Sequence, residues 1–299
     1  MSESNVVEAA GLEKRYGTVP ALDGLSLRVP AGSIFGLLGR NGAGKTTSIK
    51  VLMGMVRPTA GNVSVFGLAP HEPAAGIEIR RRVGFVDESR DLYERLTAEQ
   101  IIGVIARFYP RWRNDLAARY LRQFAIPSNR VIKQLSRGTR TKLSVLLALC
   151  RCPDLVILDE ATSGLDPDAA EEVLQALVSY AGQDGGTVLF SSHQLTEVEQ
   201  VADHIAIIDE GRTKVAGSLD ELRESYRSIE FVFDNEAPKP DLSSPGVVRI
   251  KSAGRAMVVL ASSNAEQIID EVRGMRPVSI DLRPVSIKEL FLESIVKGN

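Results

Sequence analysis

The sequence contains few cysteines and no long hydrophobic segment. Its two cysteines, Cys150 and Cys152, are one residue apart, and no second pair or histidine cluster accompanies them. This pattern favours reduced thiols over a disulfide framework or a metal site. The longest apolar run, VLLALC at 145–150, is far shorter than the roughly 20 residues that span a bilayer. The first residues, MSESNVVEAA, lack the basic start and apolar core of a secretory signal. We therefore expect a soluble chain without a transmembrane segment of its own.

Charge is low overall but unevenly distributed. The formal net charge is −2, which gives no general attraction to nucleic acid, so no nucleic-acid partner is expected. A length of 299 residues suits one large domain or two smaller ones. Residues 76–151 nevertheless hold 16 Lys and Arg against 7 Asp and Glu. This stretch is either a solvated basic face or a surface that meets an acidic partner or an anionic membrane.

A glycine-rich loop lies between a predicted strand at 33–39 and a predicted helix at 45–55. It fits the pattern G-x-x-x-x-G-K-[ST]. Glycines let backbone N–H groups approach phosphate oxygens, and the following helix directs its positive N-terminus at the same anion. Lys45 is expected to reach the β- and γ-phosphates, and the Thr46 hydroxyl can ligate Mg²⁺. The loop therefore predicts a nucleoside triphosphate site formed by Gly39, Arg40, Asn41, Gly42, Ala43, Gly44, Lys45, Thr46 and Thr47.

A second strong motif, DLVILDE at 154–160, is an apolar run that ends in two carboxylates. Buried parallel strands have this composition, and their ligands bind at the carboxyl ends of the strands. We expect Asp159 to hold Mg²⁺ and Glu160 to polarise the attacking water. The alternative is that the two carboxylates only cap the strand. Lys45 and Glu160 are the predicted catalytic residues, and the family resemblance described below adds His193.

Three weaker motifs accompany these two: LSRGTRTKL at 135–143, SGLD at 163–166 and LFSSH at 189–193. Alone, Ser136 could cap a helix and His193 could be an ordinary loop histidine. The order and spacing of all these motifs, together with KRYG around Tyr16, resemble the ATP-binding subunit of ABC transporters over residues 5 to about 220. A P-loop kinase or GTPase would lack the LSRGT and SGLD pair.

The resemblance implies roles for several residues. In this family two nucleotide-binding domains meet head to tail with two ATP molecules between them. By resemblance, Ser136 and Gly138 bind the γ-phosphate of the opposite subunit, and Asp166 communicates between the two sites. His193 resembles the histidine that contacts the γ-phosphate. Tyr16 resembles the aromatic residue that stacks on adenine, although it could instead be a core tyrosine.

Three positions depart from the family pattern. The signature LSGGQ is LSRGT here, so that Arg137 replaces a glycine and Thr139 replaces a glutamine. Glu88 stands where the family has a glutamine that touches Mg²⁺. We expect Glu88 to act as a third metal ligand beside Thr46 and Asp159, with a stronger demand for Mg²⁺.

The resemblance also implies the fold and its partners. The expected class is α/β, a P-loop NTPase of the ABC ATPase type. It has a RecA-like core, an antiparallel β subdomain of short strands in residues 5–35 and a helical subdomain at about 89–150. Residues 1–220 form this nucleotide-binding domain, and residues 221–299 form a small α+β accessory domain like those of bacterial antibiotic exporters. Its role is open between regulation, dimer support and simple stabilisation.

Within these regions, capping-box patterns predict helix starts at Thr97–Gln100, Ser263–Glu266 and Ser286–Glu289. Asp166 with Pro167 predicts another helix start.

The function implied is that ATP-driven dimerisation and hydrolysis power transport, with export favoured by the accessory domain. The partners would be a second copy of the chain and integral membrane subunits that contact the helical subdomain. The chain would then lie at the cytoplasmic face of the membrane. The alternative is a soluble ABC-type ATPase that acts on a macromolecular partner. The sequence does not identify the cargo.

Overall fold

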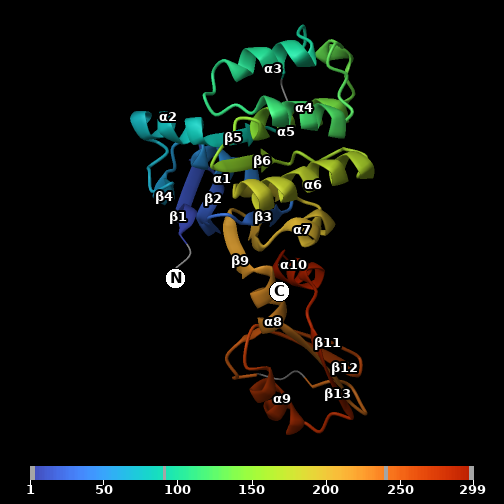
Figure 1. The fold of residues 1–299 in the computed structure, drawn as a ribbon. Coiled ribbons are helices and arrows are strands. Elements are labelled where there is room, and N and C mark those ends of the chain that lie inside the picture. The colour runs from blue at the N-terminus through green and yellow to red at the C-terminus, as the bar shows by residue number, and fades with distance from the viewer. Residues whose placement is uncertain (1–3, 90–91, 239–241, 296–299) are drawn as a thin grey trace. The chain divides into compact units, whose positions relative to one another are not determined.

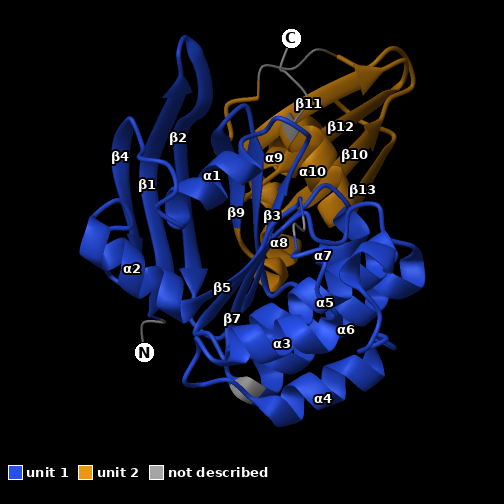
Figure 2. Cartoon of the chain, turned by 90° about the horizontal axis from the view of Figure 1, so that it is seen from above, with its two compact units in different colours: residues 1–216 blue, residues 217–299 orange. Residues whose placement is uncertain are grey.

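The computed structural model describes residues 4–89, 92–238 and 242–295. The chain divides into two compact units, Met1–Ala216 and Gly217–Asn299, which Figure 2 shows in separate colours. This boundary is four residues before the one expected from the sequence. In the described part of the chain no helix is both long enough and apolar enough to cross a bilayer.

The first unit begins with a long antiparallel hairpin rather than the short strands expected. Strands β1 (Asn5–Tyr16) and β2 (Val19–Pro30) pair along their length, and β4 (Ala60–Val65) adds to β1. The ladder shifts register near Gly11 and Gly24, both of which have positive φ. Such bulges bend a strand without ending it. The sheet therefore continues past both glycines.

A six-stranded sheet forms the centre of the first unit, in the order β5-β6-β7-β3-β8-β9. Strands β5, β6, β7, β3 and β8 pair in parallel, and β6, β7 and β3 are buried along their whole length. These strands carry continuous apolar runs, as expected for parallel strands covered on both faces. Their bounds are β3 Ile34–Gly39, β5 Val83–Val86, β6 Leu155–Asp159, β7 Thr187–Ser192, β8 His204–Asp209 and β9 Arg212–Ser218.

Helices flank this sheet and form a separate group above it in Figure 1. The group consists of α3 (Ala98–Ala106), α4 (Asn114–Gln123), the short 3₁₀ helix η1 (Ile132–Gln134) and α5 (Arg137–Leu149). It contains a stacked Tyr120–Phe124 pair, whose side chains are both buried. The predicted capping box at Thr97 and Gln100 is confirmed, with both reciprocal hydrogen bonds present. The remaining helices of the unit are α1 (Lys45–Leu52), α2 (Pro73–Arg82), α6 (Pro167–Asp184) and α7 (Leu195–Val201).

The second unit is α+β. Its antiparallel sheet has the order β11-β12-β10-β13 and packs α9 onto a core that includes Phe231, Met257 and Ile268. The predicted cap at Ser286 and Glu289 is confirmed by hydrogen bonds in both directions. The predicted cap at Ser263 is wrong. The bounds are α8 Leu219–Ser225, β10 Arg227–Val232, β11 Val247–Ala253, β12 Ala256–Ala261, α9 Ala265–Arg273, β13 Ser279–Pro284 and α10 Ile287–Ile295.

The failed cap has a local physical reason. The backbone N–H of Ser262 donates to the carbonyl of Gly246, and Asn264 Nδ2 donates to the carbonyl of Pro245. These bonds hold the segment against the preceding loop. Asn264, with φ 55°, therefore precedes the helix in place of Ser263, and its side chain makes no cap hydrogen bond.

Candidate functional site

The glycine-rich loop connects a buried strand to a helix, as predicted. Gly44 precedes α1 with φ 107°, and a Cβ atom placed on it would lie 2.7 Å from the carbonyl oxygen of Ala21. Only glycine fits this position without displacing β2. The backbone N–H of Gly211, in the turn between β8 and β9, donates to the carbonyl of Ala43 (2.9 Å). The loop is therefore supported from two neighbouring elements, which fixes where its backbone N–H groups point.

Lys45 is the first residue of α1, and its side chain is only 4% exposed. Its Nζ donates to the carbonyl oxygens of Gly39 (2.8 Å) and Arg40 (3.2 Å). The same atom lies 2.9 Å from Oε1 of Glu160. The three contacts match the three donors of an ammonium group. The sequence-predicted lysine and glutamate are thus brought together, although 115 residues separate them in the chain.

The two predicted carboxylates lie at the carboxyl end of β6 in different environments. Asp159 is 1% exposed and accepts a hydrogen bond from Ser191 Oγ (2.7 Å). Glu160 has φ 46°, which turns the chain sharply as the strand ends. The Glu160 backbone N–H donates to the same Ser191 hydroxyl (2.9 Å). The next strand, β7, thereby fixes the backbone from which the Glu160 side chain projects.

The Glu160 carboxylate joins two of the predicted catalytic residues. Its Oε2 lies 3.2 Å from Nδ1 of His193, and its Oε1 faces Lys45. Burial raises the pKa of Glu160. The hydrogen bond and charge of Lys45, together with His193, lower it by a larger amount, so that the net pKa lies below its ordinary value. Glu160 is therefore ionised at neutral pH, as a group that orients or deprotonates water must be.

A pocket of about 420 Å³ opens in front of these groups. It collects residues of the loop, the end of β6, the end of β7 and Glu88. Ala21 and Ser163 also line it, and the sequence analysis missed both. The lining residues are Ala21, Asn41, Gly42, Gly44, Lys45, Thr46, Thr47, Glu88, Glu160, Ser163 and His193.

No group of three or more His, Cys, Asp or Glu side chains in the described residues is close enough to hold a metal alone. This arrangement fits Mg²⁺, which is usually bound by one or two protein oxygens together with substrate phosphates and water. The oxygen donors available are Thr46 and Glu88 in the pocket and the buried Asp159 behind it. The predicted roles of these residues as metal ligands remain predictions.

Seven predicted ATP-binding residues do not line this pocket: Gly39, Arg40 and Ala43 of the loop, and Tyr16, Ser136, Gly138 and Asp166 elsewhere. Tyr16 ends β1 with 48% of its surface exposed, and Lys14 Nζ lies 5.2 Å from its ring centroid. Ser136 caps α5 by accepting from the Thr139 N–H (3.1 Å). Asp166 caps α6 by accepting from the Ala169 N–H (2.9 Å), as predicted. Gly138 is close to Asp166, because a Cβ atom placed on Gly138 would lie 3.9 Å from Oδ2 of Asp166.

Arg137 and Glu88, two of the three departures from the family pattern, line a second pocket of about 340 Å³ together with Ser89 and Arg140. Glu88 lines both this pocket and the one around Lys45. The Arg137 guanidinium packs against Gly164, where an added Cβ atom would lie 2.7 Å from Nη1. The basic residue of the signature therefore contacts the SGLD loop of its own chain.

Comparison with known proteins identifies the family. The model of the family described as "ABC transporter" matches residues 22–163. The bacitracin transport ATP-binding protein BcrA of Bacillus licheniformis is 34% identical over 236 residues, covering 78% of this chain and 76% of that protein. The Nod factor export ATP-binding protein I of Burkholderia thailandensis is 32% identical and covers 94% of both chains. The daunorubicin resistance ATP-binding protein DrrA3 of Streptomyces coeruleorubidus is 38% identical, covering 71% of this chain and 68% of its own.

Solved structures agree on the fold. A structure described as the ATP binding subunit of an ABC transporter has a TM-score of 0.65 and 30% identity, covering 73% of this chain and 92% of its own. A dimeric ATP-binding cassette bound to ADP and Pi has a TM-score of 0.64 at 23% identity, with 71% of this chain and 98% of its own covered. The predicted α/β fold class is confirmed. The chain belongs to the ABC transporter family as one of its ATP-binding subunits, and it is an ATPase.

Proposed function

We propose that this ATP-binding subunit acts as a homodimer that powers export through separate membrane subunits at the cytoplasmic face of the membrane. The proposed catalytic role rests on one observation: Glu160 contacts both Lys45 (2.9 Å) and His193 (3.2 Å) at one pocket. A carboxylate held between a lysine and a histidine next to a phosphate-binding loop suits hydrolysis of a γ-phosphate.

The roles of the residues follow from their positions. The loop N–H groups and Lys45 bind the triphosphate, and Glu160 orients the attacking water in line with the γ-phosphorus and accepts its proton. His193 donates a hydrogen bond to the γ-phosphate. Thr46, Asp159 and Glu88 would hold Mg²⁺, which supplies positive charge to the β- and γ-phosphate oxygens when it is bound. Such a site works mainly by placing charge and water.

A second copy of the chain completes the site. Ser136 and Gly138 lie at the N-terminus of α5, where backbone N–H groups attract anions, and neither lines the pocket around Lys45. We therefore assign them to the ATP held by the partner. Asp166 lies beside Gly138 and would relay closure to the other site. Tyr16 is exposed at a strand end, where its ring can stack on adenine.

We assign a groove beside the helical group as the docking site for the membrane subunits. It has a volume of about 190 Å³ and combines apolar side chains with one arginine. Tyr93 and Phe108, each 75% exposed, are two large side chains in the helical group with little burial. Exposed aromatic groups next to an apolar groove are typical of a protein interface. The groove is lined by Phe85, Val86, Asp87, Leu92, Ile105, Tyr109, Ser144, Leu147, Ala148 and Arg151.

The direction of transport is inferred from the relatives. Two relatives are named for Nod factor export and for daunorubicin resistance. The Nod factor relative matches this chain over nearly its whole length. That length includes the second unit, Gly217–Asn299. Export is therefore favoured, and the membrane partner would determine which cargo is transported.

Crosslinking tests the dimer in solution. One chain carries Ser136→Cys and another carries Asn41→Cys, both in the Glu160→Gln background. We expect a disulfide between the two chains only when both cysteines and ATP are present, and none in mixtures that carry one engineered cysteine. If ATP binds while the protein stays monomeric and uncrosslinked, the shared site is wrong. Co-purification with membrane subunits encoded beside this chain tests the transport role.

A further inference from the structure

One buried carboxylate near the site has no role in the mechanism above. Glu197, in the first turn of α7, is only 6% exposed. In the described part of the chain no Lys, Arg or His lies within ion-pair distance of it. An ionised group without a cation is expensive to bury unless strong hydrogen bonds stabilise it. The hydrogen bonds of Glu197 therefore identify the segments that it stabilises.

Both hydrogen bonds converge on one oxygen of this carboxylate. Oε2 of Glu197 accepts from the hydroxyl of Thr162 (2.8 Å) and from the hydroxyl of Ser192 (2.8 Å). Thr162 and Ser192 are 5% and 2% exposed, so water does not compete for these bonds. Hydrogen bonds in an environment that water does not reach are stronger than solvent-exposed ones.

The two hydroxyls belong to the two segments that carry the catalytic groups. Thr162 is two residues after Glu160, and Ser192 directly precedes His193. Ser192 also accepts from the backbone N–H of Gln194 (2.9 Å), which fixes the chain on both sides of the histidine. Glu197 therefore joins the segment after β6 to the segment after β7.

A neighbouring serine makes a matching link on the other side. Successive residues of a strand point to opposite faces, so Ser191 and Ser192 at the end of β7 face different directions. Ser191 binds Asp159 and the Glu160 backbone, whereas Ser192 binds Glu197. The Glu160–His193 contact of 3.2 Å lies between these two links.

We propose that Glu197 is a positioning residue for ATP hydrolysis. Its carboxylate fixes the segments of Thr162 and Ser192, and through them holds Glu160 and His193 facing one point of the pocket. This inference rests on the catalytic roles proposed above for Glu160 and His193. The hydrogen bonds of Glu197 go to Thr162 and Ser192, and not to the glycine-rich loop or Lys45. Its loss should therefore affect the rate of hydrolysis and not the binding of ATP.

Three variants and one control test this role. Glu197→Ala removes the link, Thr162→Val removes one hydroxyl with little change of volume, and Glu197→Gln keeps an acceptor oxygen that both hydroxyls can still reach. Glu199→Ala is the matched control, because it removes a glutamate from the same helix that makes no hydrogen bond or ion pair in the described residues. The purified full chain is assayed for kcat, KM and thermal midpoint, and for binding of a non-hydrolysable ATP analogue.

We expect Glu197→Ala to lower kcat roughly tenfold or more while KM and analogue binding stay within about threefold. Glu197→Gln should keep most of the activity, and Glu199→Ala all of it. Combining Thr162→Val with Glu197→Ala should lower kcat little beyond Glu197→Ala alone, because the two side chains act as one unit. If Glu197→Ala does not fold, Thr162→Val and Glu197→Gln decide the question at temperatures below their midpoints.

A different pattern overturns the proposal. Unchanged kcat in Glu197→Ala and Thr162→Val contradicts it, as does a fall in activity that only follows the loss of folded protein. An equal loss of activity in Glu199→Ala also contradicts it. These outcomes are separable from failure of the proposed site, because wild-type ATPase activity and its loss in Glu160→Gln are measured alongside.

Discussion

Nζ of Lys45 lies 2.9 Å from Oε1 of Glu160, and its other two donors are taken by the carbonyls of Gly39 and Arg40. An ammonium group has three donors, so a phosphate oxygen that binds Lys45 must replace one of these contacts. Glu160 carries negative charge like the phosphate, and it is therefore the partner most readily displaced. We therefore expect binding of the triphosphate to free the carboxylate to act on water.

Glu160→Gln tests this exchange. The amide cannot accept a proton from water, so kcat should fall by about two orders of magnitude or more. The amide also competes less with phosphate for Lys45, so ATP should bind at least as tightly as in the wild type. Turnover under single-turnover conditions and equilibrium binding of ATP measure the two effects. Full turnover in this variant would remove Glu160 from the reaction.

Glu88→Gln tests the acidic residue shared by the two pockets. Its carboxylate attracts the cation by its negative charge and offers it an oxygen ligand. The variant should therefore reach half-maximal ATPase rate at a Mg²⁺ concentration severalfold higher, about three- to tenfold. A Mg²⁺ titration of the ATPase rate measures this. Glu99→Gln, an exposed change on α3, is the control, and identical titration curves for wild type and Glu88→Gln would contradict the role.

The sequence was sufficient to predict residues that the structure brings together, because their motifs are contiguous. The loop at 39–47 and the strand that ends in Asp159 and Glu160 each carry their function in a few adjacent residues. The physical requirements for phosphate approach and for buried parallel strands restrict those residues strongly. The structure accordingly brings Lys45, Glu160 and His193 together as predicted.

Glu197 could not be predicted in this way. Its partners Thr162 and Ser192 are 35 and 5 residues away, and no local pattern separates a buried glutamate on a helix from an exposed one. Bulges at Gly11 and Gly24 likewise depend on pairing between strands, so the long hairpin was read as short strands. Tertiary contacts determine each of these features, and local sequence patterns do not reveal such contacts.

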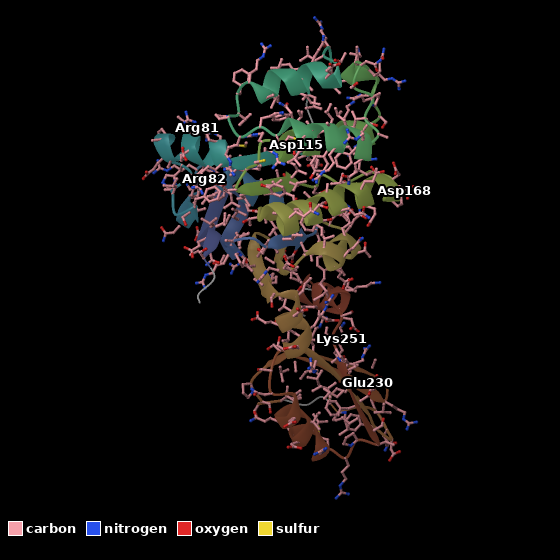
Figure 3. The ribbon with its side chains drawn as sticks, viewed as in Figure 1. Arg81, Arg82, Asp115, Asp168, Glu230 and Lys251 are labelled. Carbon is pink, nitrogen blue, oxygen red and sulfur yellow. The ribbon has the colours of Figure 1, made fainter. Side chains whose placement is uncertain are left out.

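The basic stretch at 76–151 is partly neutralised within the chain. Arg82 and Arg111 both bind Asp154, and Arg113 binds Asp115 (Figure 3 labels Arg82 and Asp115). Arg107 is exposed at the end of α3 and has no ion-pair partner among the described residues. It is next to Phe108, which is 75% exposed. Arg107 is therefore the better candidate for a charge that meets a partner.

Arg107→Glu should weaken assembly with the membrane subunits and leave binding of ATP by the isolated chain within about twofold. The reason is that a charge at an interface rim changes association, whereas the nucleotide pocket does not include this residue. Co-purification from membranes measures assembly. Arg28→Glu makes the same charge change on an exposed face of β2 and serves as the control. Equal recovery of Arg107→Glu and wild type would count against the helical group as the docking surface.

Asp154 connects three distant segments. Its Oδ2 accepts from Arg82 at the end of α2 (2.6 Å), its Oδ1 accepts from Arg111 before α4 (2.9 Å), and its backbone leads into β6. Burial raises the pKa of Asp154. The hydrogen bonds and charges of the two arginines lower it by a larger amount, so that the net pKa lies below its ordinary value. A carboxyl group with a lowered folded pKa stabilises the folded state above its unfolded pKa of about 3.9, and this contribution is lost as the pH falls through the folded value.

Asp154→Asn should therefore lower the free energy of unfolding by about 1 kcal/mol, since the group is partly exposed and screening limits the gain. The difference from wild type should be the same at pH 7 and pH 5 and should shrink only below the unfolded pKa. Thermal denaturation at several pH values measures it. Asp115→Asn is the control, because Asp115 pairs with Arg113 two residues away, a contact that the unfolded chain can also make. A difference for Asp154→Asn that is already smaller at pH 5 would show that the two arginines do not hold the pKa of Asp154 below its ordinary value.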